Sequence, residues 1–247
     1  MQVERVEWGG LSTLVVHDLP AESQPQLAVV LCHGFGAPGK DLVGLVQPLV
    51  ELEPALADKV VFLFPAAPLD LSGRGIPGGR AWWMIDLNRL IYGPPPDLLE
   101  RFRRECPLGL PEARGSLLQL VAAAGQHFGL TADRFVLGGF SQGSMLAIDV
   151  ALRLPAAPAG LAILSGALIN EAEWRPLAEK LGPLSVLQSH GRQDSILPFP
   201  MGVALKEMLL EAGAEVDFIA FPGDHEIPTL VVQKLAALLG RCLNPEP

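Results

Sequence analysis

The stretch that decides the fold is Arg134-Phe-Val-Leu-Gly-Gly-Phe-Ser-Gln-Gly-Ser144. Its apolar first half predicts a buried strand, and Met145, Leu146 and Ile148 predict the helix that follows it. Gly139-Phe-Ser-Gln-Gly143 between them matches G-x-S-x-G, in which a nucleophilic serine sits on a sharp strand-to-helix turn. A side chain two residues before or after that serine would clash, so a glycine is needed on each side. Ser141 is therefore the candidate nucleophile, with a helix N-cap as its alternative role.

Outward from this turn, short apolar runs alternate with longer helical patterns. Several of the runs are apolar at nearly every position, as strands buried on both faces should be. The alternation predicts an α/β fold with a mostly parallel central sheet and helices on both faces. Gly9-Gly10 predicts a hairpin of residues 2–8 and 12–17 at the sheet edge. The other strands are expected at 27–33, 60–64, 134–138, 160–164, 184–188 and 216–221, and the helices at 41–56, 112–129, 142–153, 171–181, 200–213 and 226–240.

One segment breaks this rhythm. Residues 65–111 are rich in proline and glycine and contain Trp82 and Trp83. A loop of this length in a compact domain is usually functional, so we expect a lid-like insertion or pocket wall, with a decorated surface crossover as the alternative. No repeat or low-complexity linker is present, so residues 1–247 are expected to form a single domain.

Composition narrows the class of protein. Hydrophobic residues make up 49% of the chain and charged residues 18%, which excludes a disordered protein. The net charge of −9 disfavours nucleic acid as a partner. Three cysteines far apart in sequence fit a reducing compartment better than a disulfide scaffold. With no signal-peptide pattern and no uninterrupted apolar stretch of about 20 residues, we expect a cytoplasmic protein without an integral membrane segment.

A nucleophilic serine needs a base and an acid. In this strand–turn–helix context they follow the serine in the order acid, then histidine. His225 follows the last predicted strand, in the kind of loop where open α/β sheets bind ligands. Asp194 follows the preceding strand and fits the acid, whereas Asp217 lies inside a strand pattern. His190 closes a strand and reads better as a buried histidine that supports a turn.

The developing oxyanion needs backbone N–H donors. Gln142, directly after the nucleophile, and Phe35, in the loop His33-Gly-Phe-Gly36, are the candidates. The glycines of that loop also have the spacing of a dinucleotide site, but the helix is predicted to start too late and the acidic residue is missing. No His, Cys or acidic residues have metal-ligand spacing. We therefore expect neither a metal nor a cofactor.

The combined motifs resemble the phospholipase/carboxylesterase branch of the α/β-hydrolases, which includes the acyl-protein thioesterases. The resemblance spans about residues 26 to 240 and rests on His33-Gly-Phe-Gly36, Pro65-Ala-Ala-Pro68, Gly138-Gly-Phe-Ser-Gln-Gly-Ser144, Leu164-Ser-Gly166, His190-Gly-Arg-Gln-Asp194 and Gly223-Asp-His225. It implies a catalytic triad of Ser141, Asp194 and His225, with Phe35 and Gln142 in the oxyanion hole. It also implies that Trp82 or Trp83 lies near the acyl pocket. This chain has Asp224 where the family has a second glycine, and its 65–111 segment is longer than usual.

The resemblance implies a serine carboxylesterase that hydrolyses short- to medium-chain esters through an acyl-enzyme on Ser141. An acyl-thioesterase or a lysophospholipase with the same triad is the alternative. A ligand-binding protein of the same fold and a peptidase are further alternatives. The expected partner is a small ester or thioester, and a homodimer stays open. An apolar pocket is predicted, with Trp82, Trp83, Leu197 and Phe199 as the substrate-binding candidates.

Overall fold

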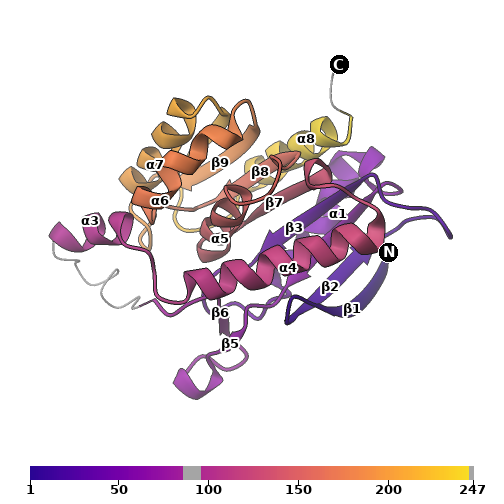
Figure 1. The fold of residues 1–247 in the computed structure, drawn as a ribbon, viewed down its shortest axis with the longest axis horizontal. Helices are drawn as coiled ribbons and strands as arrows, with labels where there is room; N and C mark the ends of the chain where they lie inside the picture. The colour runs from indigo at the N-terminus through magenta and orange to yellow at the C-terminus, as the bar shows by residue number, and fades with distance from the viewer. Residues whose placement is uncertain (86–95, 245–247) are drawn as a thin grey trace.

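An eight-stranded, mostly parallel sheet forms the centre of the structure, a computed structural model that describes residues 1–85 and 96–244 (Figure 1). The strand order is β1-β2-β4-β3-β7-β8-β9-β10, and only the β1–β2 and β2–β4 pairs are antiparallel. This confirms the predicted α/β fold. The strands are β1 (Gln2–Trp8), β2 (Leu11–His17), β3 (Leu27–Cys32), β4 (Val60–Pro65), β7 (Phe135–Phe140), β8 (Gly160–Leu164), β9 (Ser185–Gly191) and β10 (Glu215–Phe221).

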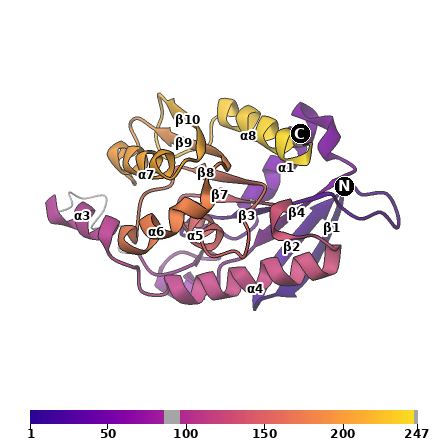
Figure 2. The ribbon, with the colours of Figure 1, turned by 45° about the horizontal axis from the view of Figure 1, so that its top comes forward.

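Helices cover both faces of the sheet, which is why every residue of β3, β4 and β8 is buried. One face packs on residues such as Leu117, Leu146 and Leu205, and the other on Leu49 and Leu235. Figure 2 shows α1 and α8 together on one side and α4 and α5 on the other. In the described ranges no helix is long and apolar enough to cross a membrane. The main helices are α1 (Val46–Leu52), α4 (Leu110–Phe128), α5 (Gln142–Ala151), α6 (Glu171–Ala178), α7 (Phe199–Glu211) and α8 (Thr229–Leu243).

The N-terminal hairpin forms at the edge of the sheet, as predicted. Trp8 pairs with Leu11 across the turn, and Gly9 and Gly10 have φ values of 61° and 71°. Gly9 also lies directly against α4, where a Cβ atom would come within 2.2 Å of the Ser116 carbonyl oxygen. The glycine pair therefore supplies both the turn conformation and the close approach of the hairpin to the helix.

Helix boundaries depart from the sequence patterns at proline residues. The helix predicted over 41–56 is divided into a 3₁₀ turn at Asp41–Leu45, then α1, then a second 3₁₀ turn at Pro54–Leu56. The last helix begins at Thr229, not at residue 226, because Pro228 fixes its N-terminus. Residues 222–228 thus remain a loop after β10.

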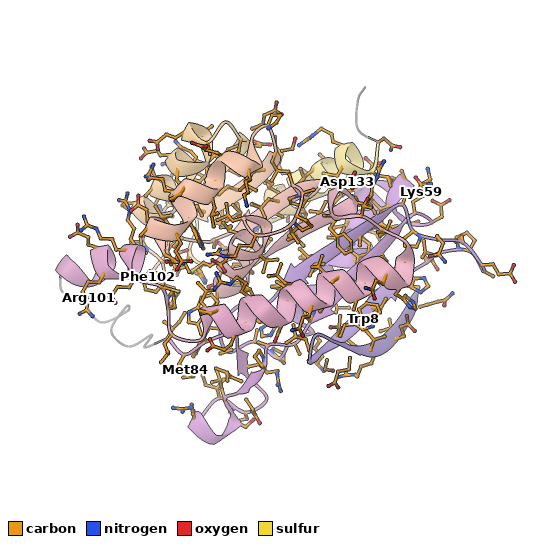
Figure 3. The ribbon with its side chains drawn as sticks, viewed as in Figure 1. Trp8, Lys59, Met84, Arg101, Phe102 and Asp133 are labelled. Atoms are coloured by element: carbon orange, nitrogen blue, oxygen red, sulfur yellow. The ribbon has the colours of Figure 1, made fainter. Side chains whose placement is uncertain are left out.

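The predicted insertion at 65–111 lies only partly inside the described residues, because 86–95 fall outside them. Its described part contains a small two-stranded sheet, β5 (Leu69–Asp70) with β6 (Arg80–Ala81), which projects from the main body (Figure 1). The helix α3 (Pro96–Arg104) follows, and its Phe102 packs against the larger core cluster (Figure 3). Arg101, Arg103 and Arg104 lie on this helix.

An ion-pair network joins α3 to α6. Two nitrogens of the Arg103 guanidinium each donate to a Glu171 carboxylate oxygen at 2.7 Å. Arg175 donates to the same carboxylate at 2.7 Å and also pairs with Glu211. These bonds, led by that of Arg103, lower the pKa of Glu171 from 4.5 to about 2.

Glu171→Gln is expected to lower the free energy of unfolding at neutral pH by roughly 1 kcal/mol, since the paired charge lies near the surface. The folded-state pKa lies below the unfolded one, so the stabilisation is complete above about pH 4.5. It is lost as the pH falls towards about 2. Urea unfolding of both proteins at about pH 7 and about pH 3 measures this. Glu100→Gln, which breaks only an exposed pair with Arg104, is the control. A difference independent of pH would contradict the assignment.

Candidate active site

Ser141 occupies the sharp turn between β7 and α5. Its φ of 54° and ψ of −120° are a conformation that residues other than glycine rarely adopt. The turn is held because the Ser141 N–H donates to the Leu164 carbonyl at 2.8 Å. The Ser141 carbonyl in turn accepts from the Ser144 N–H at 3.1 Å and from the Ser144 hydroxyl at 2.7 Å. The strained serine is therefore fixed from both sides.

The two glycines around Ser141 pack against the end of β3. A Cβ atom on Gly139 would lie 2.4 Å from the Cys32 carbonyl oxygen, and one on Gly143 would lie 2.1 Å from it. Those distances are far shorter than any real contact, so neither position accepts a side chain. The steric reason for the G-x-S-x-G spacing is thus visible in this chain.

Asp194 and His225 meet at the carboxyl ends of two adjacent parallel strands, β9 and β10. Nδ1 of His225 lies 2.7 Å from Oδ2 of Asp194, which is buried. The other carboxylate oxygen, Oδ1, accepts from the N–H groups of Ile196 at 2.9 Å and Leu197 at 2.7 Å. Because both oxygens are bonded, the Asp194 carboxylate has a fixed direction towards the imidazole.

The imidazole of His225 lies beside the nucleophile turn. Its ring centroid is 4.7 Å from that of Phe140, the residue before Ser141. Among the contacts of the described residues, the Ser141 hydroxyl has no hydrogen bond to His225. In hydrolases without ligand this bond is often long, and it tightens when substrate is bound.

Asp217 and His190, the other acid and base considered from the sequence, take no part in the contact between Asp194 and His225. His190 is buried, with Nε2 2.8 Å from the Leu197 carbonyl oxygen and 3.4 Å from Oδ2 of Asp194. Burial lowers the pKa of His190, so the ring is neutral and supports the loop that carries Asp194. Asp217 pairs with Lys234 on the outside of α8. In the described part of the chain no cluster of three His, Cys or acidic residues could hold a metal ion.

Two main-chain N–H groups near Ser141 are left without a protein acceptor. Among the described residues, neither the Phe35 N–H nor the Gln142 N–H donates to another group of the protein. The next residue differs, because the Gly36 N–H donates to the Arg80 carbonyl at 2.8 Å. Among the described residues, both residues predicted for the oxyanion hole therefore have a main-chain donor that can bind a ligand.

The main chains of Trp82 and Trp83 are hydrogen-bonded to Gln142, and the Trp82 indole is bonded to His33 after β3. The sequence did not indicate these bonds. Oε1 of Gln142 accepts from the Trp82 N–H at 3.0 Å, and Nε2 donates to the Trp83 carbonyl at 2.8 Å. The Trp82 indole N–H donates to the His33 carbonyl at 2.9 Å. The only sequence signal was the pair of tryptophans itself, because contacts some 60 residues apart leave no periodic pattern.

The four candidates for substrate binding lie around the site with little exposed surface. Trp82 and Trp83 are 1% exposed and Leu197 is 2% exposed. Phe199 is half-buried between the His190 and Phe218 rings. Their role in an acyl pocket stays a prediction. Met84, directly after the tryptophans, is 45% exposed (Figure 3).

Trp82→Phe is expected to destabilise the protein by about 1–3 kcal/mol more than Trp83→Phe, because it leaves the buried His33 carbonyl without its donor. Trp83→Phe is a matched control: it removes the same volume from an equally buried site, and the Trp83 indole N–H has no partner among the described residues. Urea unfolding measures both variants. Equal losses would show that the indole hydrogen bond contributes nothing beyond packing.

This chain is similar to known proteins over most of its length. A curated acyl-protein thioesterase 1 of Neurospora crassa is 27% identical over 213 residues, covering 83% of this chain and 82% of the relative. One of Gibberella zeae is 27% identical over 235 residues, covering 92% and 95%. The crystal structure of esterase PE8 superposes with a TM-score of 0.76 at 26% identity, covering 93% of this chain and 97% of that one. The family model described as Phospholipase/Carboxylesterase matches residues 19–243. The chain therefore belongs to the phospholipase/carboxylesterase family and has the α/β-hydrolase fold.

Proposed function

We propose that this protein is a serine hydrolase that cleaves short- to medium-chain carboxylic esters through an acyl-enzyme on Ser141. The observation that carries the proposal is the 2.7 Å contact between Asp194 and His225 beside the strained nucleophile turn. A pair of this kind orients an imidazole as a general base. Membership of the family supports the hydrolytic chemistry.

In the proposed mechanism His225 holds its Nδ1 proton towards Asp194, which leaves Nε2 free to take the proton of Ser141. The serine oxygen attacks the ester carbonyl, and the oxyanion accepts hydrogen bonds from the N–H groups of Phe35 and Gln142. Protonated His225 then gives its proton to the leaving alcohol. Water repeats the sequence on the acyl-enzyme and releases the acid.

The second candidate function is thioester hydrolysis by the same residues. It is favoured by the names of the curated relatives, which are acyl-protein thioesterases. The chemistry differs only in the leaving group, a thiol in place of an alcohol. Lysophospholipase activity would need the same triad and a longer acyl site.

The remaining proposals concern the surroundings of the triad. We propose that the 65–111 segment is a lid-like insertion in a single domain. Trp82, Trp83, Leu197 and Phe199 are proposed as the apolar wall of the acyl site. Support comes from the hydrogen bonds of both tryptophans to Gln142 and from the place of Leu197 in the Asp194 loop.

Ser141→Ala is expected to lower kcat by about a million-fold if the triad acts as a unit. It should also abolish labelling by a fluorophosphonate probe. The measurement is hydrolysis of p-nitrophenyl esters from acetate to palmitate, beside S-acyl N-acetylcysteamine thioesters of the same lengths. Ser23→Ala, in an exposed loop, is the control for both assays. An optimum at about two to four carbons with esters preferred supports the first candidate. Equal activity of Ser141→Ala and the wild type would overturn both candidates.

A further inference from the structure

A second carboxylate lies beside the candidate triad and is bonded to the loop that carries the first. Oδ1 of Asp224 accepts from the Ser195 N–H at 2.7 Å and from the Ser195 hydroxyl at 2.9 Å. Oδ2 of Asp224 lies 3.1 Å from the same hydroxyl. Oδ1 also accepts from the N–H of His225 at 2.8 Å. One exposed carboxylate thus binds three donors from two loops.

The contact of Asp224 with Ser195 matters because of where the two residues lie in the sequence. Ser195 directly follows Asp194, and Asp224 directly precedes His225. The bond from Asp224 to Ser195 therefore joins the immediate neighbours of the two residues whose side chains meet at 2.7 Å. A shift of one loop against the other would have to break both contacts together.

The backbones of the two loops are already close where the strands end. The Gln193 N–H donates to the Gly223 carbonyl at 3.0 Å. A Cβ atom on Gly191 would lie 2.2 Å from the Asp224 carbonyl oxygen, so only glycine permits this approach. The Asp224 carboxylate adds a side-chain bond between the same two loops, next to Asp194 and His225.

We propose that Asp224 is a positioning residue for the reaction: its carboxylate clamps the loop of His225 to the loop of Asp194. The inference rests on the proposed function, because it assigns Asp224 a role in that same site. A geometric role for Asp224 predicts a loss in kcat, since the clamp touches no part of the substrate-binding candidates.

The charge of Asp224 is present at neutral pH. The hydrogen bonds from Ser195, then the N–H and the charge of His225, hold the pKa of Asp224 below its ordinary value of 3.8. The carboxylate that makes these bonds is therefore ionised, which strengthens each of them.

The test compares three variants with the wild type on the best ester substrate. Asp224→Ala is expected to lower kcat by roughly 10- to 100-fold, with KM changed less than about 2-fold, because the loops lose their clamp. Asp224→Asn keeps an acceptor for the two N–H groups, so its kcat should stay within about 3-fold of the wild type. Asp217→Ala, which removes a charge on β10 away from the site, should leave kcat unchanged.

Ser195→Ala supplies an independent arm, because it removes one hydroxyl and leaves the Ser195 N–H in place. Its expected loss in kcat is about 3-fold, and in the Asp224→Ala background it should cause no further loss. Ser195→Ala and Asp224→Asn, each measured alone, keep the proposal testable even if Asp224→Ala folds poorly.

The outcomes separate the two proposals. If Ser141→Ala is inactive but every Asp224 and Ser195 variant keeps the kcat of the wild type, the positioning role is overturned alone. Independent losses from the Asp224 and Ser195 substitutions would overturn the clamp as well. A wild-type protein that neither hydrolyses esters or thioesters nor reacts with a fluorophosphonate would overturn the proposed function and this inference together.

Discussion

The close approach of the nucleophile turn to the end of β3 is the constraint on which the rest of the site depends. With Gly139 and Gly143 against the Cys32 carbonyl, the backbone around Ser141 has room for one path only. That path gives Ser141 a positive φ and puts α5 directly behind it. The oxyanion candidates follow, because the loop after β3 and the first residue of α5 are brought side by side.

The second requirement is that the candidate side chains meet, and the parallel strands provide this. β7, β9 and β10 carry the candidate nucleophile, acid and base into loops at one edge of the sheet, although these residues lie far apart in the chain. Loops alone would leave these side chains loosely arranged. Here they are cross-bonded to their neighbours, by the main chain of residues 191–197 and by the side chains of Gln142 and Asp224. Hydrogen bonds between the loops therefore hold this edge rigid as much as the sheet does.

The fold was largely predictable because it depends on local patterns. Fully apolar runs predicted the central strands, and Gly9-Gly10 predicted the hairpin. The contact of Asp194 with His225 could also be anticipated, since the carboxyl ends of adjacent parallel strands meet. Their catalytic roles stay predictions. The bonds of Gln142 to Trp82 and Trp83 could not be anticipated, because a side chain that binds distant backbone groups leaves no periodicity in the sequence.

Gln142 has one further consequence, which concerns how such a chain can change over evolutionary time. Its main-chain N–H is proposed for the oxyanion hole, and its carboxamide binds Trp82 and Trp83 within the 65–111 segment. A new loop inserted after Trp83 would leave these bonds in place, so the outer segment can diversify freely. A replacement that begins before Arg80 would remove the groups that Gln142 binds and disturb the nucleophile turn. Variation in substrate range is therefore expected to accumulate beyond residue 83, while the segment 80–83 stays tied to the turn that carries Ser141.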